Sequence, residues 1–205
     1  MGSDRFGFLL AAAIGAYALL GCTEQGADHG PVGSTATYLG AVEGTEARIA
    51  LVQSGDELLA YVCGQGDTLE SHTRWYAGSF ALNDAGAHEL AAGGWHLSFS
   101  DLSAGIVDGE LIAPTGEVQR WTAQRAQDGS EVGLYESREL GCRTGVIVWG
   151  ALAGPECNAQ GVWCDASGAR GQVTPAECTA EGPLLMRGMR DGAWFDFVAE
   201  RVQLP

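Results

Sequence analysis

Residues 46–63 decide the fold, and they read EARIALVQ-SGD-ELLAYVC. The two apolar segments are short and rich in residues that favour strands, and Ser54-Gly55-Asp56 between them is typical of a hairpin turn. The second segment is apolar from Leu58 to Cys63, a pattern that predicts a buried strand. This stretch therefore predicts an antiparallel hairpin with a strand in the core.

The same pattern of short strand-forming segments and turn residues continues on both sides of this hairpin. Short β-prone runs bounded by Gly, Asn, Asp or Pro recur at roughly 10-residue spacing, which is typical of a sandwich or small barrel rather than βαβ units. Evidence for helices is poor, and the 31 glycines suit tight turns. The sequence thus predicts an all-β fold, an antiparallel sandwich or small barrel. Further strands are expected at 38–42, 73–80, 95–99, 105–112, 118–123, 132–136 and 143–149.

The C-terminal part of the chain has a different character. A Gly- and Pro-containing linker begins at Gly150, and three cysteines follow it within 22 residues. Runs at 184–189 and 193–202 are joined by Arg190-Asp191-Gly192, a hairpin signal. We expect a disulfide-stapled β extension at 150–205, packed on an all-β domain at 37–149.

The N-terminal apolar run, from Phe6 to Leu20, ends in the sequence Leu19-Leu20-Gly21-Cys22. Over these first 22 residues the chain resembles a bacterial prolipoprotein with its lipobox. The resemblance implies cleavage after residue 21, attachment of diacylglycerol to the Cys22 thiol, and export of a protein anchored to a membrane by lipid. Residues 22–36 are then a flexible tether, because they lack apolar periodicity and are rich in Gly and small polar residues.

Two alternatives exist for this N-terminal segment. Ala16-Tyr17-Ala18 fits an ordinary signal-peptidase site, which would give a soluble secreted protein. An uncut anchor is disfavoured, because roughly 15 apolar residues are fewer than the ~20 that span a bilayer. The lipobox resemblance also implies an outer-membrane location in a host with two membranes, because Thr23 is not the aspartate that retains lipoproteins at the inner membrane.

The charge balance excludes several classes of function. The chain has 26 carboxylates against 11 cations, and its arginines are scattered, so it lacks the basic face that a nucleic-acid partner requires. All the cations are arginines. Without lysine there can be no phosphate loop of the GxxxxGK type and no Schiff-base chemistry, which excludes pyridoxal phosphate. We expect no cofactor, and the membrane, reached through lipid on Cys22, is the one partner predicted.

Familiar catalytic motifs are missing. There is no GxSxG sequence, and His88-Glu89 lacks the second histidine of a zinc protease helix. His72, His88 and His96 fit scattered surface positions, so no catalytic or metal residue is predicted. The sequence favours a lipid-anchored cell-envelope protein with a binding or structural β domain of unknown ligand. The alternative is a small secreted hydrolase with a dispersed Ser/His/Asp or metal site.

Five cysteines remain once Cys22 is lipidated, so one thiol is expected to be free. Cys63 is the candidate, because its strand is predicted to be buried and it would act there as a small hydrophobe. The other four can form disulfides, the default in an exported protein. One prediction pairs Cys157 with Cys164 and Cys142 with Cys178. The alternative pairs Cys164 with Cys178 and Cys142 with Cys157.

Overall fold

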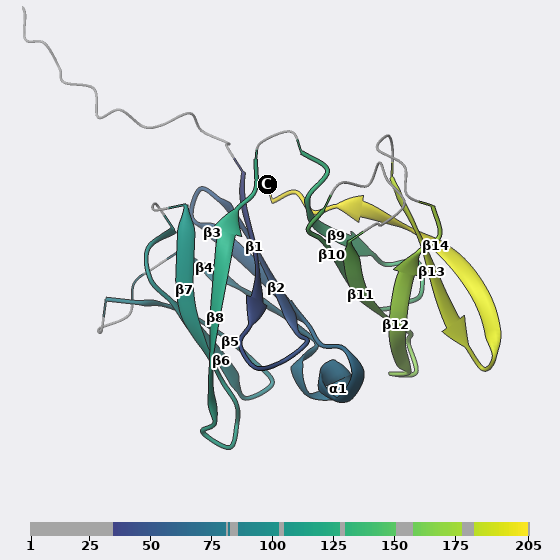
Figure 1. The fold of residues 1–205 in the computed structure, drawn as a ribbon, viewed down its shortest axis with the longest axis horizontal. Coiled ribbons are helices and arrows are strands. Elements are labelled where there is room, and N and C mark those ends of the chain that lie inside the picture. Colours follow the sequence, from purple (N-terminus) through teal and green to yellow (C-terminus); the bar gives the residue numbers. More distant parts are fainter. Residues whose placement is uncertain are drawn as a thin grey trace, which may run out of the picture. The chain divides into compact units, whose positions relative to one another are not determined.

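The structure is a computed structural model that describes residues 35–80, 82, 86–102, 105–127, 130–150, 158–177 and 183–204. The chain from Val32 to Pro205 forms one compact unit (Figure 1). Of the described residues, 61% are in strands and 5% in helices. The predicted all-β class is therefore confirmed. Within the described ranges, no helix has the length and apolar character needed to cross a membrane. The predicted leader, Cys22 and most of the tether lie outside these ranges.

The first sheet contains eight antiparallel strands in the order β4-β3-β2-β1-β8-β7-β6-β5. It curls so that its edge strands β4 and β5 contact each other. A short turn, η1 (Gly66–Thr68) and α1 (Leu69–His72), connects β3 to β4. The strands are β1 (Ala36–Val42), β2 (Arg48–Ser54), β3 (Glu57–Cys63), β4 (Arg74–Ser79), β5 (His88–Ala92), β6 (Trp95–Phe99), β7 (Ile106–Ile112) and β8 (Val118–Arg125).

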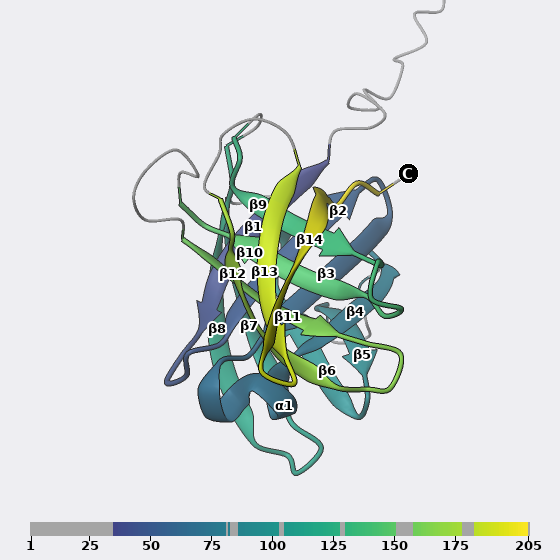
Figure 2. The same ribbon diagram turned by 90° about the vertical axis from the view of Figure 1, so that its right-hand side faces the viewer.

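The second sheet is a closed six-stranded barrel in the order β10-β11-β12-β13-β14-β9 (Figure 2). Its strands are β9 (Gly133–Ser137), β10 (Thr144–Val148), β11 (Ala159–Cys164), β12 (Arg170–Pro175), β13 (Leu184–Arg190) and β14 (Ala193–Arg201). The barrel begins with β9, so β9 and β10 pair with strands that follow residue 150. Strands β9 and β10 therefore belong to the same barrel as the strands after residue 150. The boundary between the two sheets follows β8, although the sequence pattern changes at residue 150.

Each strand expected from the sequence is present, with ends that differ by no more than two residues. The predicted turns also form. Gly55 takes a φ of 54°, and Asp191 and Gly192 take φ of 52° and 78°, values that two-residue hairpin loops require. Strands β5, β11 and β12 were not expected, and neither was α1.

Strand β3 is buried on both faces, which explains its unbroken apolar sequence. Side chains alternate between the faces of a strand. One set enters the core inside the first sheet, and the other enters a second core shared with β9, β10 and β11. The first set is Leu58, Ala60 and Val62, and the second is Leu59, Tyr61 and Cys63. A third core fills the barrel of the second sheet around Trp163, Met186 and Phe197.

Cys142 and Cys164 form a disulfide, with Cα atoms 5.8 Å apart. Both predicted pairings are therefore wrong, since each gave Cys164 another partner. The prediction assumed a short local loop ending at Cys164, but residues 159–164 form an extended strand that rises ~3.3 Å per residue. Antiparallel pairing of β10 with β11 instead brings Cys142 beside Cys164. Cys63 is free and buried, as predicted, while Cys157 and Cys178 lie outside the described residues.

Candidate functional site

The three histidines of the domain have separate surroundings. His72 is buried, with its Nε2 2.8 Å from Gln119 Oε1, and His88 is buried against two phenylalanine rings. His96 is exposed, and its Nδ1 lies 2.7 Å from Glu89 Oε1. The predicted surface position therefore holds for His96 alone. In the part of the chain that the structure describes, no three His, Cys, Asp or Glu side chains are grouped to hold a metal ion.

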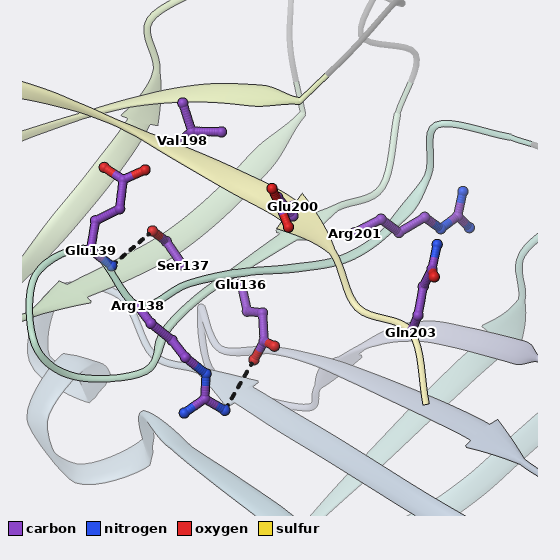
Figure 3. A pocket seen from close by; sticks show the side chains of 8 residues that line it. All are labelled: Glu136, Ser137, Arg138, Glu139, Val198, Glu200, Arg201 and Gln203. Atoms are coloured by element: carbon purple, nitrogen blue, oxygen red, sulfur yellow. Dashed lines mark hydrogen bonds and ion pairs between the residues drawn. The ribbon is translucent and has the colours of Figure 1, made fainter. Parts of the chain in front are cut away.

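An open groove of about 580 Å³ lies where β9 and β14 close the barrel (Figure 3). Its cations are already engaged. Arg138 lies 3.9 Å from Glu136, and Arg201 donates to the backbone carbonyls of Ser130 and Val132. The groove is lined by Glu136, Ser137, Arg138, Glu139, Val198, Glu200, Arg201 and Gln203. With three glutamates against two arginines in its lining, this groove has no excess of positive charge.

A smaller cavity of about 200 Å³ has a different lining and is here named the arginine pocket. It holds three of the chain's 11 arginines and no carboxylate, although acids outnumber cations 26 to 11. Its walls come from both sheets. The lining residues are Tyr61, Thr73, Arg74, Trp75, Arg143, Val162, Cys164 and Arg170. This concentration of positive charge makes the arginine pocket the candidate site.

An aromatic wall supports one side of the arginine pocket. Tyr61 on β3 lies opposite Trp75 on β4, and their ring centroids are 4.5 Å apart. The Arg143 guanidinium lies over the Trp75 ring, with Cζ 3.9 Å from its centroid. Trp75 Nε1 donates to the Arg143 carbonyl at 2.9 Å. Trp75 is thus fixed by contacts with both sheets.

The charge of Arg143 is compensated within the protein. Its Nε donates to the carboxylate of Glu136, and both side chains are about one-quarter exposed, at 26% and 27%. An ion pair with this geometry occupies part of the guanidinium's hydrogen-bonding capacity. Arg143 therefore contributes more to the wall than to the free positive charge of the pocket.

Arg74 and Arg170 have no such partner. Arg74 lies over the Trp95 ring at 4.6 Å, and Arg170 Nη1 donates to the Thr73 carbonyl at 3.4 Å. Among the described residues, neither guanidinium has a carboxylate at ion-pair distance. The guanidinium of Arg74 donates instead to the backbone carbonyls of Ser71, His72 and Ala92.

The two uncompensated arginines are close enough to affect each other. Burial lowers the pKa of Arg74, and the positive charge of Arg170 lowers it further, while Tyr76 opposes both. Repulsion of this kind is relieved when an anion binds between the charges. Guanidinium groups present a planar set of N–H donors that matches carboxylate and phosphate oxygens. The arginine pocket is therefore suited to binding an anion.

No pattern in the sequence points to this site. Arg74, Arg143 and Arg170 belong to three separate segments, and no short motif links them. Of the cysteines predicted to form disulfides, Cys164 lines the pocket and Cys142 is bonded to it. Cys22, the predicted lipidation site, lies outside the described residues.

The tryptophans belong only in part to the buried cores. Trp95, Trp121 and Trp163 are buried, whereas Trp75 forms a pocket wall and Trp194 is 66% exposed.

No family model matches this chain, and no curated protein or solved structure is significantly similar to it.

Proposed function

We propose that this protein is a lipid-anchored protein of the cell envelope whose β domain binds a small anion in the arginine pocket. One observation carries the binding function: Arg74 and Arg170 line the same cavity, and among the described residues neither has a carboxylate at ion-pair distance. In a chain this acidic, two neighbouring arginines without a carboxylate partner indicate that a ligand supplies the negative charge.

The two arginines have different roles in the proposal. Arg74 is held in place by three backbone carbonyls, so its charge is fixed before a ligand arrives. Arg170 is exposed and makes one hydrogen bond, which leaves most of its five N–H donors available. Arg170 is therefore the group that contacts the anion directly, and Arg74 adds a fixed positive charge.

The membrane anchor in this proposal is the lipid on Cys22. Its support is the sequence Leu19-Leu20-Gly21-Cys22 followed by a Gly-rich tether. In a host with two membranes, the proposal places the protein at the outer membrane. Metabolic labelling with a tagged fatty acid tests the anchor: wild type is labelled and processed, and Cys22→Ala is neither. Label that persists in Cys22→Ala, or no label in wild type, would remove the anchor from the proposal.

Calorimetric titration of the full-length mature protein in non-ionic detergent tests the pocket, with sodium acetate and sodium sulfate as probes. Hydrogen bonds to charged groups contribute ~1.5–3 kcal/mol, so Arg170→Gln should weaken binding roughly 10- to 100-fold. Arg187→Gln is the matched control. It removes one positive charge from a residue that pairs with Asp196 and does not line the pocket.

Two results would reject the binding function. One is the absence of saturable binding of either probe by the wild type. The other is an equal loss of affinity in Arg170→Gln and Arg187→Gln, because that would show a response to net charge rather than to this pocket.

A further inference from the structure

The walls of the arginine pocket are mostly apolar. Apart from the three arginines and Thr73, the lining consists of Tyr61, Trp75, Val162 and Cys164. Tyr61 is 1% exposed and Val162 is 2% exposed, so these walls belong to the buried core between the sheets. The lining of the cavity therefore combines apolar walls with the positive charge of the arginines.

Two of the three polar groups in these walls are already engaged within the protein. Trp75 Nε1 donates to the Arg143 carbonyl, and the Thr73 hydroxyl accepts from the Gly64 amide at 3.0 Å. The Tyr61 hydroxyl is buried and has no hydrogen-bond partner among the described residues. A ligand that presents polar atoms to these walls would lose hydrogen bonds with water and gain few in return.

The cavity volume sets the size of the ligand. Since a water molecule occupies ~30 Å³ of the liquid, about 200 Å³ has room for roughly six or seven water-sized groups. This is smaller than the ~300–1,000 Å³ of pockets that hold drug-sized ligands. A molecule of roughly six or seven non-hydrogen atoms fits this space.

Building on the proposed function, we infer that the arginine pocket binds a short-chain carboxylate whose apolar chain lies against Tyr61, Trp75 and Val162. The carboxylate group pairs with Arg170, near the fixed charge of Arg74. Two features together favour this class over an inorganic oxyanion: the cations bind any small anion, whereas the apolar walls stabilise only one that carries a hydrocarbon group. Butyrate and pentanoate match the size of the cavity.

A homologous series tests this inference on the mature protein in non-ionic detergent. Acetate, propionate, butyrate, pentanoate and octanoate are titrated beside sulfate and the neutral alcohol 1-butanol. Each methylene buried in the pocket should raise affinity about fourfold, which corresponds to ~0.8 kcal/mol. The gain should continue to butyrate or pentanoate and stop before octanoate, because the cavity is then full. Butyrate should bind more tightly than sulfate, and 1-butanol should bind much more weakly.

Two variants locate the binding. Arg170→Gln should weaken every acid by a similar factor, because each uses the same carboxylate contact, while Arg187→Gln should leave the series unchanged. Val162→Thr keeps the shape of the wall but adds a hydroxyl, so it should reduce the gain per methylene and leave acetate affinity near wild type. If Val162→Thr does not fold, the wild-type series with the two arginine variants still decides the question.

The possible failures are distinguishable. Arg170-dependent binding of sulfate and acetate with no gain along the series would overturn the carboxylate inference and leave the anion-binding function intact. Equal affinities of each acid for wild type and Arg170→Gln, or equal binding of butyrate and 1-butanol, would place the acids elsewhere. That result would reject both. Absence of binding by every anion would also reject both.

Discussion

Trp75 and Arg143 make two contacts with each other across the two sheets. The Arg143 Cζ lies 3.9 Å from the Trp75 ring centroid, and Trp75 Nε1 donates to the Arg143 carbonyl at 2.9 Å. Trp75 belongs to β4 of the first sheet, and Arg143 directly precedes β10 of the second. This pair therefore stabilises the junction of the sheets and fixes one wall of the arginine pocket.

Trp75→Phe should lower the free energy of unfolding by ~1–2 kcal/mol. The substitution keeps an aromatic ring under Arg143 but removes the donor, so the Arg143 carbonyl loses its partner. Urea denaturation followed by circular dichroism measures the change. Trp194→Phe is the control, because Trp194 is 66% exposed and its substitution should change stability by less than ~0.5 kcal/mol. Equal effects of the two substitutions would contradict the prediction.

Replacing both Cys142 and Cys164 by serine should lower the free energy of unfolding by ~3 kcal/mol. The disulfide closes a loop with a sequence separation of 22, and its main effect is to restrict the unfolded chain. Urea denaturation of the double variant beside the oxidised wild type provides the measurement. A difference near zero would show that this bridge does not form in the protein.

Cys157 and Cys178 should form the second disulfide. Cys142 is bonded to Cys164, and Cys63 is buried and free, so these two are the thiols that remain once Cys22 carries lipid. Strands β11 and β12 are antiparallel, with Gly161 opposite Val173, so the start of β11 and the end of β12 lie at the same end of the pair. Cys157 precedes that start in the sequence, and Cys178 follows that end. Peptide mass mapping without reduction should recover Cys157 linked to Cys178. A peptide in which either one is linked to Cys63 would contradict the assignment.

Gly145→Ala should destabilise the contact between the sheets by ~1–3 kcal/mol. A Cβ at this position would lie 2.5 Å from Tyr61 Cζ, and the Tyr61 ring already packs on Trp75 at 4.5 Å. Thermal and urea denaturation measure the loss. Gly133→Ala on the neighbouring strand is the control, because its Cβ would meet only the Arg201 guanidinium, at 3.3 Å. An equal loss in both variants would rule out the Tyr61 clash as the cause.

Stability should fall at alkaline pH, in part through Cys63. Burial raises the pKa of the Cys63 thiol to about 12, above its ordinary value of ~8.5. The folded state then holds a proton that the unfolded state releases. The stabilisation is complete below pH ~8.5 and is lost as pH rises toward 12.

Cys63→Ala tests this dependence. Urea denaturation from pH 8 to pH 11 should show a shallower alkaline decline in the variant, because one group contributes up to ~1.4 kcal/mol per pH unit. Tyr61, whose pKa burial also raises, is present in both proteins and acts in the same direction. Identical slopes for wild type and variant would exclude a contribution from Cys63.

Local sequence patterns were enough to predict eleven of the fourteen described strands and two of their hairpin turns. The alternating and continuous apolar patterns give the local structure, and Gly55 and the Asp191-Gly192 pair specify turns through their own backbone preferences. The strand at 57–63 was predicted to be buried because its apolar residues occupy successive positions. These features depend on neighbours in the chain, so they can be read without the fold.

The choice of strands that share a sheet, of the cysteine that bonds to Cys164, and of the arginines that meet depends on the packed fold. Apolar alternation shows which side of a strand is buried but does not name the strand beside it. Strand β10 therefore gave no sign that it pairs with β11, a pairing that brings Cys142 to Cys164. Arg74 and Arg170, nearly a hundred positions apart in the chain, approach each other because both sheets contribute walls to one cavity. Contacts between distant segments depend on how the cores pack, and no local pattern encodes them.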